Sequence, residues 1–306
     1  MTKRVHLLGH PVSHSVSPIL QNAAFKALGL DWEYTAWDLE PAELIERLER
    51  LEANPNVVGC NVTVPHKLAV FEWLQATGRS IHPGAAQAHA VNTLFRDPAG
   101  KFCGDSTDAM GGLVAIGHET KSQGLPDLTG RDVAILGTGG SASSFGFLLG
   151  KAPRGATSVS IFGRSTTKAS DLADRINSWE RLDGQLEVQA HPLHEFSRWN
   201  RNRHSLIIQT TTVGMDSGPD PRHSPVPDDA IGEGQIAFDL VYKPHQTTFL
   251  KDAAFNGATT VHGIYMLIGQ GVLALELWLK ASGSPTDHGL DLTKVMEQAL
   301  RDNRVL

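Results

Sequence analysis

Three side chains that could act on a polar substrate lie close together in the segment 61–67. They are the carboxamide of Asn61, the hydroxyl of Thr63 and the ammonium group of Lys67. The apolar run 57–60 before them predicts a buried strand, and the residues after Pro65 predict a helix. Ligands of open α/β sheets bind at the carboxyl ends of the strands, where these groups would lie. A lysine that opens a helix is usually exposed, however, so Lys67 is a candidate only together with neighbouring groups.

Two serines precede the first predicted helix, at residues 18–28. Ser17, directly before Pro18, has the features of an N-cap. The alternative is that Ser17 helps to bind a carboxylate, because a helix N-terminus offers free N–H groups and the positive end of the helix dipole. Ser15 has no capping duty in either interpretation and could turn its hydroxyl toward the same anion. Asp108 opens a later short helix and could likewise be no more than an N-cap.

The second half of the chain begins with a continuous apolar run, 133–136, typical of a parallel strand buried on both faces. A glycine-rich turn follows, and a helix is predicted from residue 143 to about 149. The pattern G-x-G-x-x-G/A between a strand and a helix is the dinucleotide-binding fingerprint, in which a helix N-terminus faces the pyrophosphate. A glycine-rich turn without a ligand is the alternative. The turn consists of Gly137, Thr138, Gly139, Gly140, Ser141 and Ala142.

The residues after the next predicted strand indicate which dinucleotide would bind. An NAD site usually has an acidic residue here, which holds the ribose hydroxyls. This chain has Arg164 followed by Ser165, and Lys168 four residues after the arginine. Two cations suit a 2′-phosphate, so we predict NADP as the cofactor. Two solvated surface cations are the alternative.

Composition narrows the classes of protein. The 306 residues suffice for two domains, and the 41% hydrophobic share is typical of a globular protein. A net charge of −6 argues against a nucleic-acid surface or an anionic membrane as partner. Two cysteines, the lack of a signal peptide and no window that approaches a membrane span predict a cytoplasmic protein. His6, His10 and His14 lie across a strand and a loop, and no metal motif occurs, so we expect no metal.

Together these motifs resemble the shikimate dehydrogenase family over nearly the whole chain. The glycine fingerprint is one of them, and the others follow in the family's order. They are Ser15-Val16-Ser17-Pro18, Asn61-Val62-Thr63-Val64-Pro65-His66-Lys67, Ala90-Val91-Asn92-Thr93, Gly104-Asp105-Ser106-Thr107-Asp108, Asp239-Leu240-Val241-Tyr242, and Gly263-Ile264-Tyr265-Met266-Leu267 with Gln270.

The resemblance implies reversible reduction of 3-dehydroshikimate to shikimate with NADPH. It also implies an α/β fold: an N-terminal α/β substrate domain (1–109), a Rossmann-like doubly wound NADP domain (110–262) and C-terminal helices (263–306) that return to the first domain. The catalytic pair would be Lys67 and Asp108. The substrate-binding residues would be Ser15, Ser17, Thr63, Asn92, Tyr242 and Gln270. The cofactor-binding residues would be Gly137, Gly139, Gly140, Ser141, Ala142, Arg164, Ser165, Lys168, Thr211, Gly263 and Met266.

The chemistry of the pair agrees with this activity. Hydride addition to a ketone leaves an alkoxide, which needs a proton and a nearby positive charge. Lys67 could supply both, and Asp108 would keep the ammonium charged and oriented.

Several positions depart from the family pattern. His89 stands where glycine is usual, Ser106 where asparagine is usual, and Gln209 ends a strand that usually carries Asn-Ala-Thr. Quinate, an aminated analogue or another hydroxy-cyclohexane carboxylate therefore stay possible substrates. A regulatory protein that binds a metabolite without turnover is the alternative from another class. The presence of both Lys67 and Asp108 argues against it. We expect a monomer or a homodimer.

Overall fold

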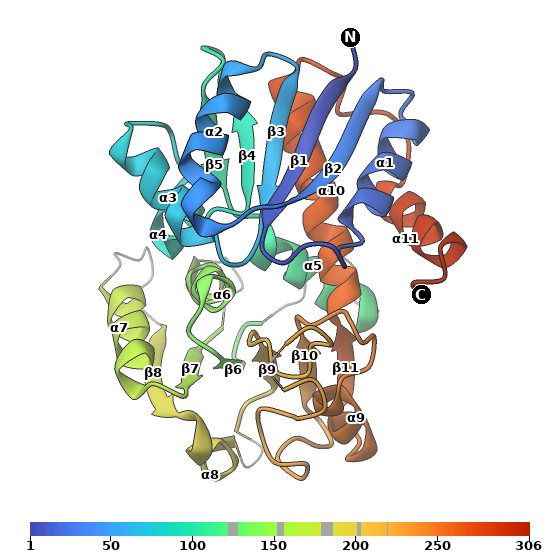
Figure 1. Cartoon of the computed structure of the whole chain (residues 1–306). Helices are drawn as coiled ribbons and strands as arrows, with labels where there is room; N and C mark the ends of the chain where they lie inside the picture. The colour runs from blue at the N-terminus through green and yellow to red at the C-terminus, as the bar shows by residue number, and fades with distance from the viewer. Residues whose placement is uncertain (122–127, 152–155, 179–185, 201–202, 219) are drawn as a thin grey trace. The chain divides into compact units, whose positions relative to one another are not determined.

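The computed structural model describes residues 1–121, 128–151, 156–178, 186–200, 203–218 and 220–306. The chain divides into two compact units. Unit 1 contains residues 1–108 and 268–306, and unit 2 contains residues 109–267. Each unit is built on one β-sheet (Figure 1). The polar segment 121–130, which contains proline and glycine, is expected from the sequence to link two domains, and most of it lies outside the described residues.

The sheet of unit 1 has the strand order β2-β1-β3-β4-β5. Three strands are parallel: β1 (Lys3–Gly9), β2 (Trp32–Asp38) and β3 (Val57–Val62). The turn signal 97–100 in the sequence predicts a hairpin, and the structure has it as β4 (Thr93–Arg96) and β5 (Phe102–Asp105). Strand β4 runs antiparallel to β3. Every residue of β3 is buried, as expected for the central strand of a covered sheet. The segment 61–67 therefore starts in the middle of the sheet, at its carboxyl edge.

Helices cover both faces of this sheet. On one face, η1 (Pro41–Glu43), α2 (Leu44–Ala53), α3 (Lys67–Ala76) and α4 (Pro83–Ala88) follow the strands, and α2 and α3 contribute leucine and aromatic side chains to the core. On the other face, Trp278 of α10 (Gly263–Ala281) donates a hydrogen bond to the carbonyl of Leu94 at 2.9 Å. A Cβ on Gly59 would lie 2.4 Å from Trp278 Nε1, so only glycine allows this approach. Helices α1 (Ser17–Ala27) and α11 (Leu292–Asp302) pack together.

Helix α10 corrects the expectation that no window of the sequence approaches a membrane span. It contains an 18-residue window with a mean hydropathy of 1.3, long and apolar enough by composition to cross a membrane. Half of that window is buried inside the protein, and Leu275 and Trp278 are fully buried. The core helix of a globular protein has the same properties, because it is apolar all round.

Unit 2 has six parallel strands in the order β11-β10-β9-β6-β7-β8. If the strands of this unit are numbered 1 to 6 from β6 to β11 along the chain, their order in the sheet, read from β8, is 3-2-1-4-5-6. This is the strand order of the doubly wound dinucleotide-binding fold. The predicted α/β fold class is thereby confirmed. The strands are β6 (Asp132–Leu136), β7 (Ser158–Gly163), β8 (Glu187–Pro192), β9 (Leu206–Gln209), β10 (Ile236–Asp239) and β11 (Thr259–His262). The helices and turns are α5 (Asp108–Glu119), α6 (Gly140–Lys151), α7 (Thr166–Asn177), η2 (Leu193–Glu195), α8 (Phe196–Asn200) and α9 (Thr248–Phe255).

Several elements, among them α4 and α8, were not predicted from the sequence, and two of the differences have clear physical reasons. Helix α6 begins at Gly140, three residues earlier than predicted, because small residues without apolar spacing form its first turn. Strand β11 was not predicted, because its four residues Thr259–His262 show neither an apolar run nor a clear alternation.

Candidate active site

Lys67 and Asp108 form an ion pair at the carboxyl edge of the sheet in unit 1. Lys67 is the first residue of α3, which follows β3, and Asp108 is the first residue of α5, which follows β5. Lys67 Nζ lies 2.5 Å from Asp108 Oδ2, and the two side chains are only 16% and 7% exposed. Lys67 is therefore not a solvated surface lysine, and the Asp108 carboxylate does more than cap a helix. Such charge-assisted hydrogen bonds are short and strong.

The loop that carries Lys67 is held from inside the protein. The ring of His66 is buried, and its Nε2 lies 2.7 Å from the carbonyl oxygen of Leu39. The backbone N–H of Thr63 donates to the carbonyl of Leu8 at 2.9 Å. A Cβ on Gly9 would lie 2.3 Å from the Thr63 methyl group, so Thr63 packs directly on the end of β1. These contacts place Thr63 and Lys67 on the same edge.

Asn92 and Gln270 complete the group around the carboxylate. Asn92 Nδ2 donates to Asp108 Oδ1 at 2.7 Å, while Lys67 binds the other oxygen. Gln270 Oε1 lies 3.4 Å from both Asn92 Nδ2 and the hydroxyl of Thr107. Unit 1 thus brings together four of the predicted residues from α3, α5, α10 and the start of the β4–β5 hairpin. The amide of Gln270, unusual on an apolar helix, has polar partners here.

The two serines differ from the prediction. Helix α1 begins at Ser17 itself, with Val16 as N-cap and no side-chain cap bond. Ser15 Oγ accepts a hydrogen bond from the backbone N–H of Ser17 at 3.3 Å and donates to Ser17 Oγ at 3.2 Å. The expectation that Ser17 is the N-cap is therefore wrong. Ser15, one residue before the N-cap, instead binds the first N–H of the helix. Pro18 is tolerated in the second helical position as well as the first, because neither N–H has a partner within the helix. Both hydroxyls lie at the N-terminus of an 11-residue helix, a position that favours an anion.

The glycine-rich turn of unit 2 has the shape that a pyrophosphate requires. Gly137 has φ of +120°, and a Cβ there would lie 2.5 Å from Thr210 Oγ1, so only glycine fits. A Cβ on Gly139 would meet no atom within 4 Å, so the backbone is open to a ligand at that point. Helix α6 starts at Gly140, and its first-turn N–H groups suit an anion. In this turn Ser141 is half-buried, and Ala142 is fully buried beneath it. These features fit a dinucleotide.

Three exposed residues follow the neighbouring strand β7. Arg164, Ser165 and Lys168 all lie at its carboxyl end, and Ser165 Oγ caps α7 by accepting from Lys168 N at 3.3 Å. A Cβ on Gly163 would lie 2.9 Å from the Thr138 methyl group, so this end of β7 packs against the glycine-rich turn. The two cations are therefore close to the expected pyrophosphate site, and they fit a 2′-phosphate.

The remaining predicted residues also lie in unit 2. The backbone N–H of Thr211 donates to Gln209 Oε1 at 2.5 Å, and its hydroxyl accepts from Val213 N at 3.2 Å, so Gln209 organises this loop. A Cβ on Gly263 would lie 2.5 Å from the Leu240 carbonyl oxygen, which requires glycine. Met266 is buried, and Tyr242, after β10, is half-buried. Tyr242 is thus not among the residues that unit 1 brings together.

Sequence reasoning missed three buried polar residues behind Asn92. Asn61 was noticed as a carboxamide but not included among the site residues, and Tyr34 and Thr93 were not considered. All three are at most 5% exposed and hydrogen-bonded to one another or to Asn92. A usable signal was the asparagine within a buried strand, because a buried amide needs polar partners.

Two of the three closely spaced histidines near the N-terminus have side-chain hydrogen-bond partners. His6 Nδ1 lies 2.8 Å from Thr35 Oγ1, and His10 Nδ1 lies 2.6 Å from Asp38 Oδ1. Burial lowers the pKa of His6 to about 4, so its ring is neutral at pH 7. Within the described part of the chain, no three acidic, histidine or cysteine side chains form a metal-binding cluster.

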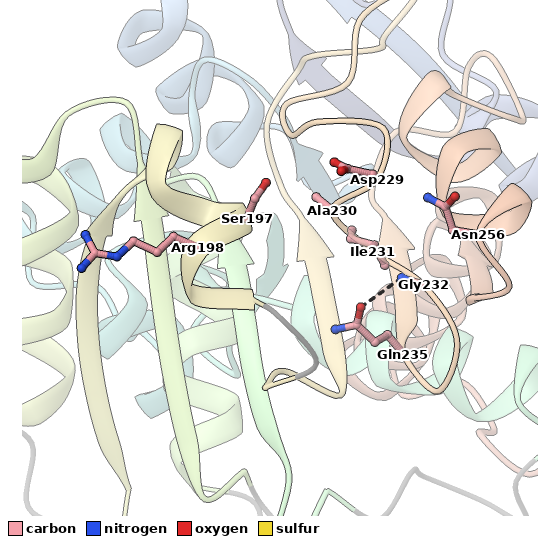
Figure 2. Close-up of a pocket in the computed structure, with 8 residues that line it drawn as sticks. All are labelled: Ser197, Arg198, Asp229, Ala230, Ile231, Gly232, Gln235 and Asn256. Atoms are coloured by element: carbon pink, nitrogen blue, oxygen red, sulfur yellow. Dashed lines mark hydrogen bonds between the residues drawn. The ribbon is translucent and has the colours of Figure 1, made fainter.

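A cavity of about 530 Å³ in unit 2 contains none of the predicted residues. Its lining comes from α8, the segment before β10 and the end of α9, so it lies at the amino ends of the strands. Figure 2 shows Arg198 extending away from the other lining side chains. Cofactors of doubly wound sheets bind at the opposite, carboxyl edge. This cavity is therefore not the candidate active site.

Comparison with known proteins agrees with the geometry. A family model described as "Shikimate dehydrogenase substrate binding domain" matches residues 7–94. A shikimate dehydrogenase (NADP(+)) of Methanothermobacter thermautotrophicus is 38% identical over 299 residues, which cover 96% of this chain and 94% of the relative. The chain belongs to the shikimate dehydrogenase family.

Solved structures of similar proteins cover the whole chain. The shikimate 5-dehydrogenase of Thermus thermophilus, in complex with NADP(H) and shikimate, has a TM-score of 0.75 and 32% identity, covering 99% of this chain and all of that one. The ligand-free 5-ketofructose reductase of Gluconobacter sp. strain CHM43 has a TM-score of 0.76 and 28% identity, with 99% of both chains covered. Proteins similar to this shikimate dehydrogenase family member thus include one named for a different substrate.

Proposed function

We propose that the chain is an NADP-dependent shikimate dehydrogenase, an oxidoreductase that interconverts 3-dehydroshikimate and shikimate. One observation supports this most directly. The Lys67 ammonium is paired at 2.5 Å with an Asp108 carboxylate whose other oxygen is held by Asn92. A shielded, oriented ammonium is the group that ketone reduction needs.

In the proposed mechanism, the hydride for the carbonyl carbon would come from NADPH when it is bound in unit 2. Lys67 donates a proton to the oxygen that becomes an alkoxide, and its positive charge stabilises the developing negative charge. Asp108 holds the ammonium in position, and Asn92 holds Asp108. In the oxidation of shikimate Lys67 accepts the hydroxyl proton, and Asp108 stabilises the ammonium that forms.

We assign substrate binding to the N-terminal domain, residues 1–109, with helices from residues 263–306. The hydroxyls of Ser15 and Ser17 would bind the carboxylate, helped by the dipole of α1. The ring hydroxyls would be bound by polar side chains with both donor and acceptor capacity. These are Thr63, Asn92, Tyr242 and Gln270.

We assign NADP binding to residues 110–262, completed by the first turn of α10. Gly137, Gly139 and the N-terminus of α6 would cradle the pyrophosphate. Arg164 and Lys168 would bind the 2′-phosphate, in keeping with a basic rather than an acidic residue directly after β7. Thr211, Gly263 and Met266 would lie beside the rest of the cofactor. A cytoplasmic location belongs to the same proposal, because Cys60 and Cys103 are both buried free thiols.

Two departures from the family pattern, Ser106 and His89, are the reason to test other substrates beside shikimate. Ser106 adjoins the candidate site, and its backbone N–H donates to Asp105 Oδ1 at 2.7 Å. His89 is exposed next to the buried segment 90–94. Quinate is the second candidate substrate. 5-Ketofructose is a third, because a protein similar in structure is named 5-ketofructose reductase. The paired serines favour a carboxylate over the sugar.

The test is nicotinamide absorbance at about 340 nm with the purified protein, which follows the reduced cofactor directly. Shikimate and quinate are each combined with NADP⁺ and NAD⁺, and 5-ketofructose is combined with NADPH. We expect the fastest turnover with shikimate and NADP⁺. Faster oxidation of quinate, or faster reduction of 5-ketofructose, would identify that compound as the substrate in place of shikimate. Binding of shikimate without turnover would support a regulatory protein instead.

A further inference from the structure

A line of buried hydrogen bonds crosses the sheet of unit 1 and ends on Asp108. The hydroxyl of Tyr34, on β2, donates to Asn61 Oδ1 at 2.8 Å. Asn61 Nδ2 donates to Thr93 Oγ1 at 3.2 Å, and the Thr93 hydroxyl donates to Asn92 Oδ1 at 2.8 Å. Asn92 Nδ2 then donates to Asp108 Oδ1 at 2.7 Å.

Every hydrogen bond in this line points the same way. The donor is always on the Tyr34 side and the acceptor on the Asp108 side, and the last acceptor is the carboxylate that pairs with Lys67. Hydrogen bonds in series polarise one another, so each one strengthens the next in a low-dielectric interior. Tyr34 is 1% exposed and Thr93 is fully buried. Removal of either hydroxyl would therefore leave its hydrogen-bond partner unsatisfied in the interior, which costs free energy.

The line from Tyr34 reaches the Asn92 carboxamide at its oxygen, where it joins a hydrogen bond from the backbone. Its Oδ1 accepts from the Thr93 hydroxyl and, at 2.9 Å, from the backbone N–H of Thr107. A backbone N–H can only donate, so Oδ1 must face Thr107 and Nδ2 must face Asp108. The Thr93 hydroxyl accepts from Asn61 and donates to Asn92 at 2.8 Å, a shorter contact than the 3.4 Å to the Thr107 hydroxyl. Asn61 Nδ2 also donates to the backbone carbonyl of Asn92 at 3.2 Å, and Tyr34 holds the other end of the same amide by donating to its oxygen.

We propose that Tyr34 is a positioning residue for the reaction. Its hydroxyl orients Asn61 and Thr93, and through Asn92 it holds the Asp108 carboxylate against Lys67. Tyr34 touches neither substrate nor cofactor in this role. The inference rests on the proposed function, because it concerns the same catalytic pair.

The first experiment compares Tyr34→Phe with Thr35→Val. Tyr34→Phe removes one hydroxyl from the line. Thr35→Val, in the next residue of β2, removes a hydrogen bond of equal length to His6 that has no link to Asn92. We expect kcat for shikimate oxidation to fall about 3- to 10-fold in Tyr34→Phe, as for loss of one hydrogen bond. Thr35→Val should retain wild-type kcat, and the KM for NADP⁺ should stay unchanged in both variants.

A second pair of variants tests the line without Tyr34. Thr93→Val removes the hydroxyl that binds Asn92, and Thr93→Ser keeps it. We expect Thr93→Val to lower kcat and Thr93→Ser to restore it, at similar thermal stability. This pair decides the question if Tyr34→Phe fails to fold.

A double-mutant cycle identifies the residue through which Tyr34 acts. In an Asp108→Asn background, Tyr34→Phe should lower the residual kcat by less than about twofold, because its target is already lost. An equal loss in both backgrounds overturns the proposal, as does an equal kcat for Tyr34→Phe and Thr35→Val. A wild-type protein without shikimate turnover would instead refute the proposed function, and this inference with it.

Discussion

The imidazole ring of His89 stacks on the ring of Phe71, with centroids 4.6 Å apart and planes inclined by 13°. His89 forms the C-cap of α4 with φ of 51° and ψ of 39°, a left-handed conformation that favours glycine. This explains why the family pattern usually has glycine here. In this chain the stacking offsets the conformational cost of a side chain.

Replacement of His89 separates these two effects. His89→Ala loses the stacking but keeps the left-handed cost, so it should lower the free energy of unfolding by about 1 kcal/mol. His89→Gly loses the stacking but relieves the cost, so it should stay close to wild type. Urea unfolding measures both. If the glycine variant is as unstable as the alanine variant, the backbone conformation is not what governs this position.

Lys67 should act by donating a proton as well as by its charge. Lys67→Ala should lower kcat at least about 100-fold with little change in substrate affinity. Lys67→Arg keeps a positive charge beside Asp108 but cannot give up a proton at neutral pH, so it should be nearly as inactive. Steady-state kinetics and equilibrium binding of shikimate decide this. Substantial turnover by Lys67→Arg would reduce the role of Lys67 to electrostatics.

Arg164 should select NADP over NAD. Arg164→Ala should raise the KM for NADP⁺ about 10-fold, the effect of losing one charged hydrogen bond, and should leave the KM for NAD⁺ unchanged. Lys168→Ala should have a smaller effect in the same direction. Steady-state titration of both cofactors provides the measurement, and equal changes for NADP⁺ and NAD⁺ would place the phosphate elsewhere.

Glu52 should stabilise the N-terminal unit in a pH-dependent way. It accepts two hydrogen bonds from Arg79, at 2.6 and 2.8 Å, and one from the backbone N–H of Phe102. The bonds to Arg79 lower the pKa of Glu52 to about 2. Because the unfolded-state pKa is about 4.3, this stabilisation is complete above that pH and is lost as the pH falls toward about 2.

Glu52→Gln should therefore lower the free energy of unfolding by about 2 kcal/mol at pH 7 and show a shallower decline in acid. Glu46→Gln is the matched control. Glu46 lies on α2, like Glu52, and pairs with Arg50, but both of these side chains are more than 60% exposed. It should cost less than about 0.5 kcal/mol. Chemical denaturation from pH 7 to pH 3 compares the two, and equal losses at pH 7 would contradict the expectation.

Asp239 should affect stability in the opposite direction. Its carboxyl group is fully buried, which raises its pKa to about 7, despite hydrogen bonds from Thr247 and Val241. The unfolded-state pKa is about 3.9. The protonated Asp239 therefore makes its full contribution to the free energy of unfolding below about pH 4, and this contribution is lost as the pH rises through about 7. Asp239→Asn should remove that decline and be more stable than wild type at pH 8 by about 1 kcal/mol or more. Denaturation at pH 5 and pH 8 tests this, and a variant with an unchanged pH dependence would contradict it.

Much of the fold was determined by local signals in the sequence. The apolar runs at 57–60 and 133–136 are buried strands, and the glycines after Leu136 form the expected turn, because an interior run and a forced backbone conformation depend on few distant residues. The type and place of Arg164 were sufficient to suggest a 2′-phosphate, whereas the pairing of Lys67 with Asp108 was implied only by the family resemblance.

Tertiary structure alone decided what those residues contact. Whether Asp108 caps a helix or binds an ammonium depends on Lys67, 41 positions away in the sequence. The line from Tyr34 to Asn92 joins three strands, and no spacing along one strand predicts which side chains meet across a sheet. Ser17 lies in the first position of α1 and not at its N-cap for a similar reason, since the start of α1 was set by how the preceding loop folds. Local propensity acts over a few residues, whereas hydrogen bonds in a buried site are completed by segments that only folding brings together.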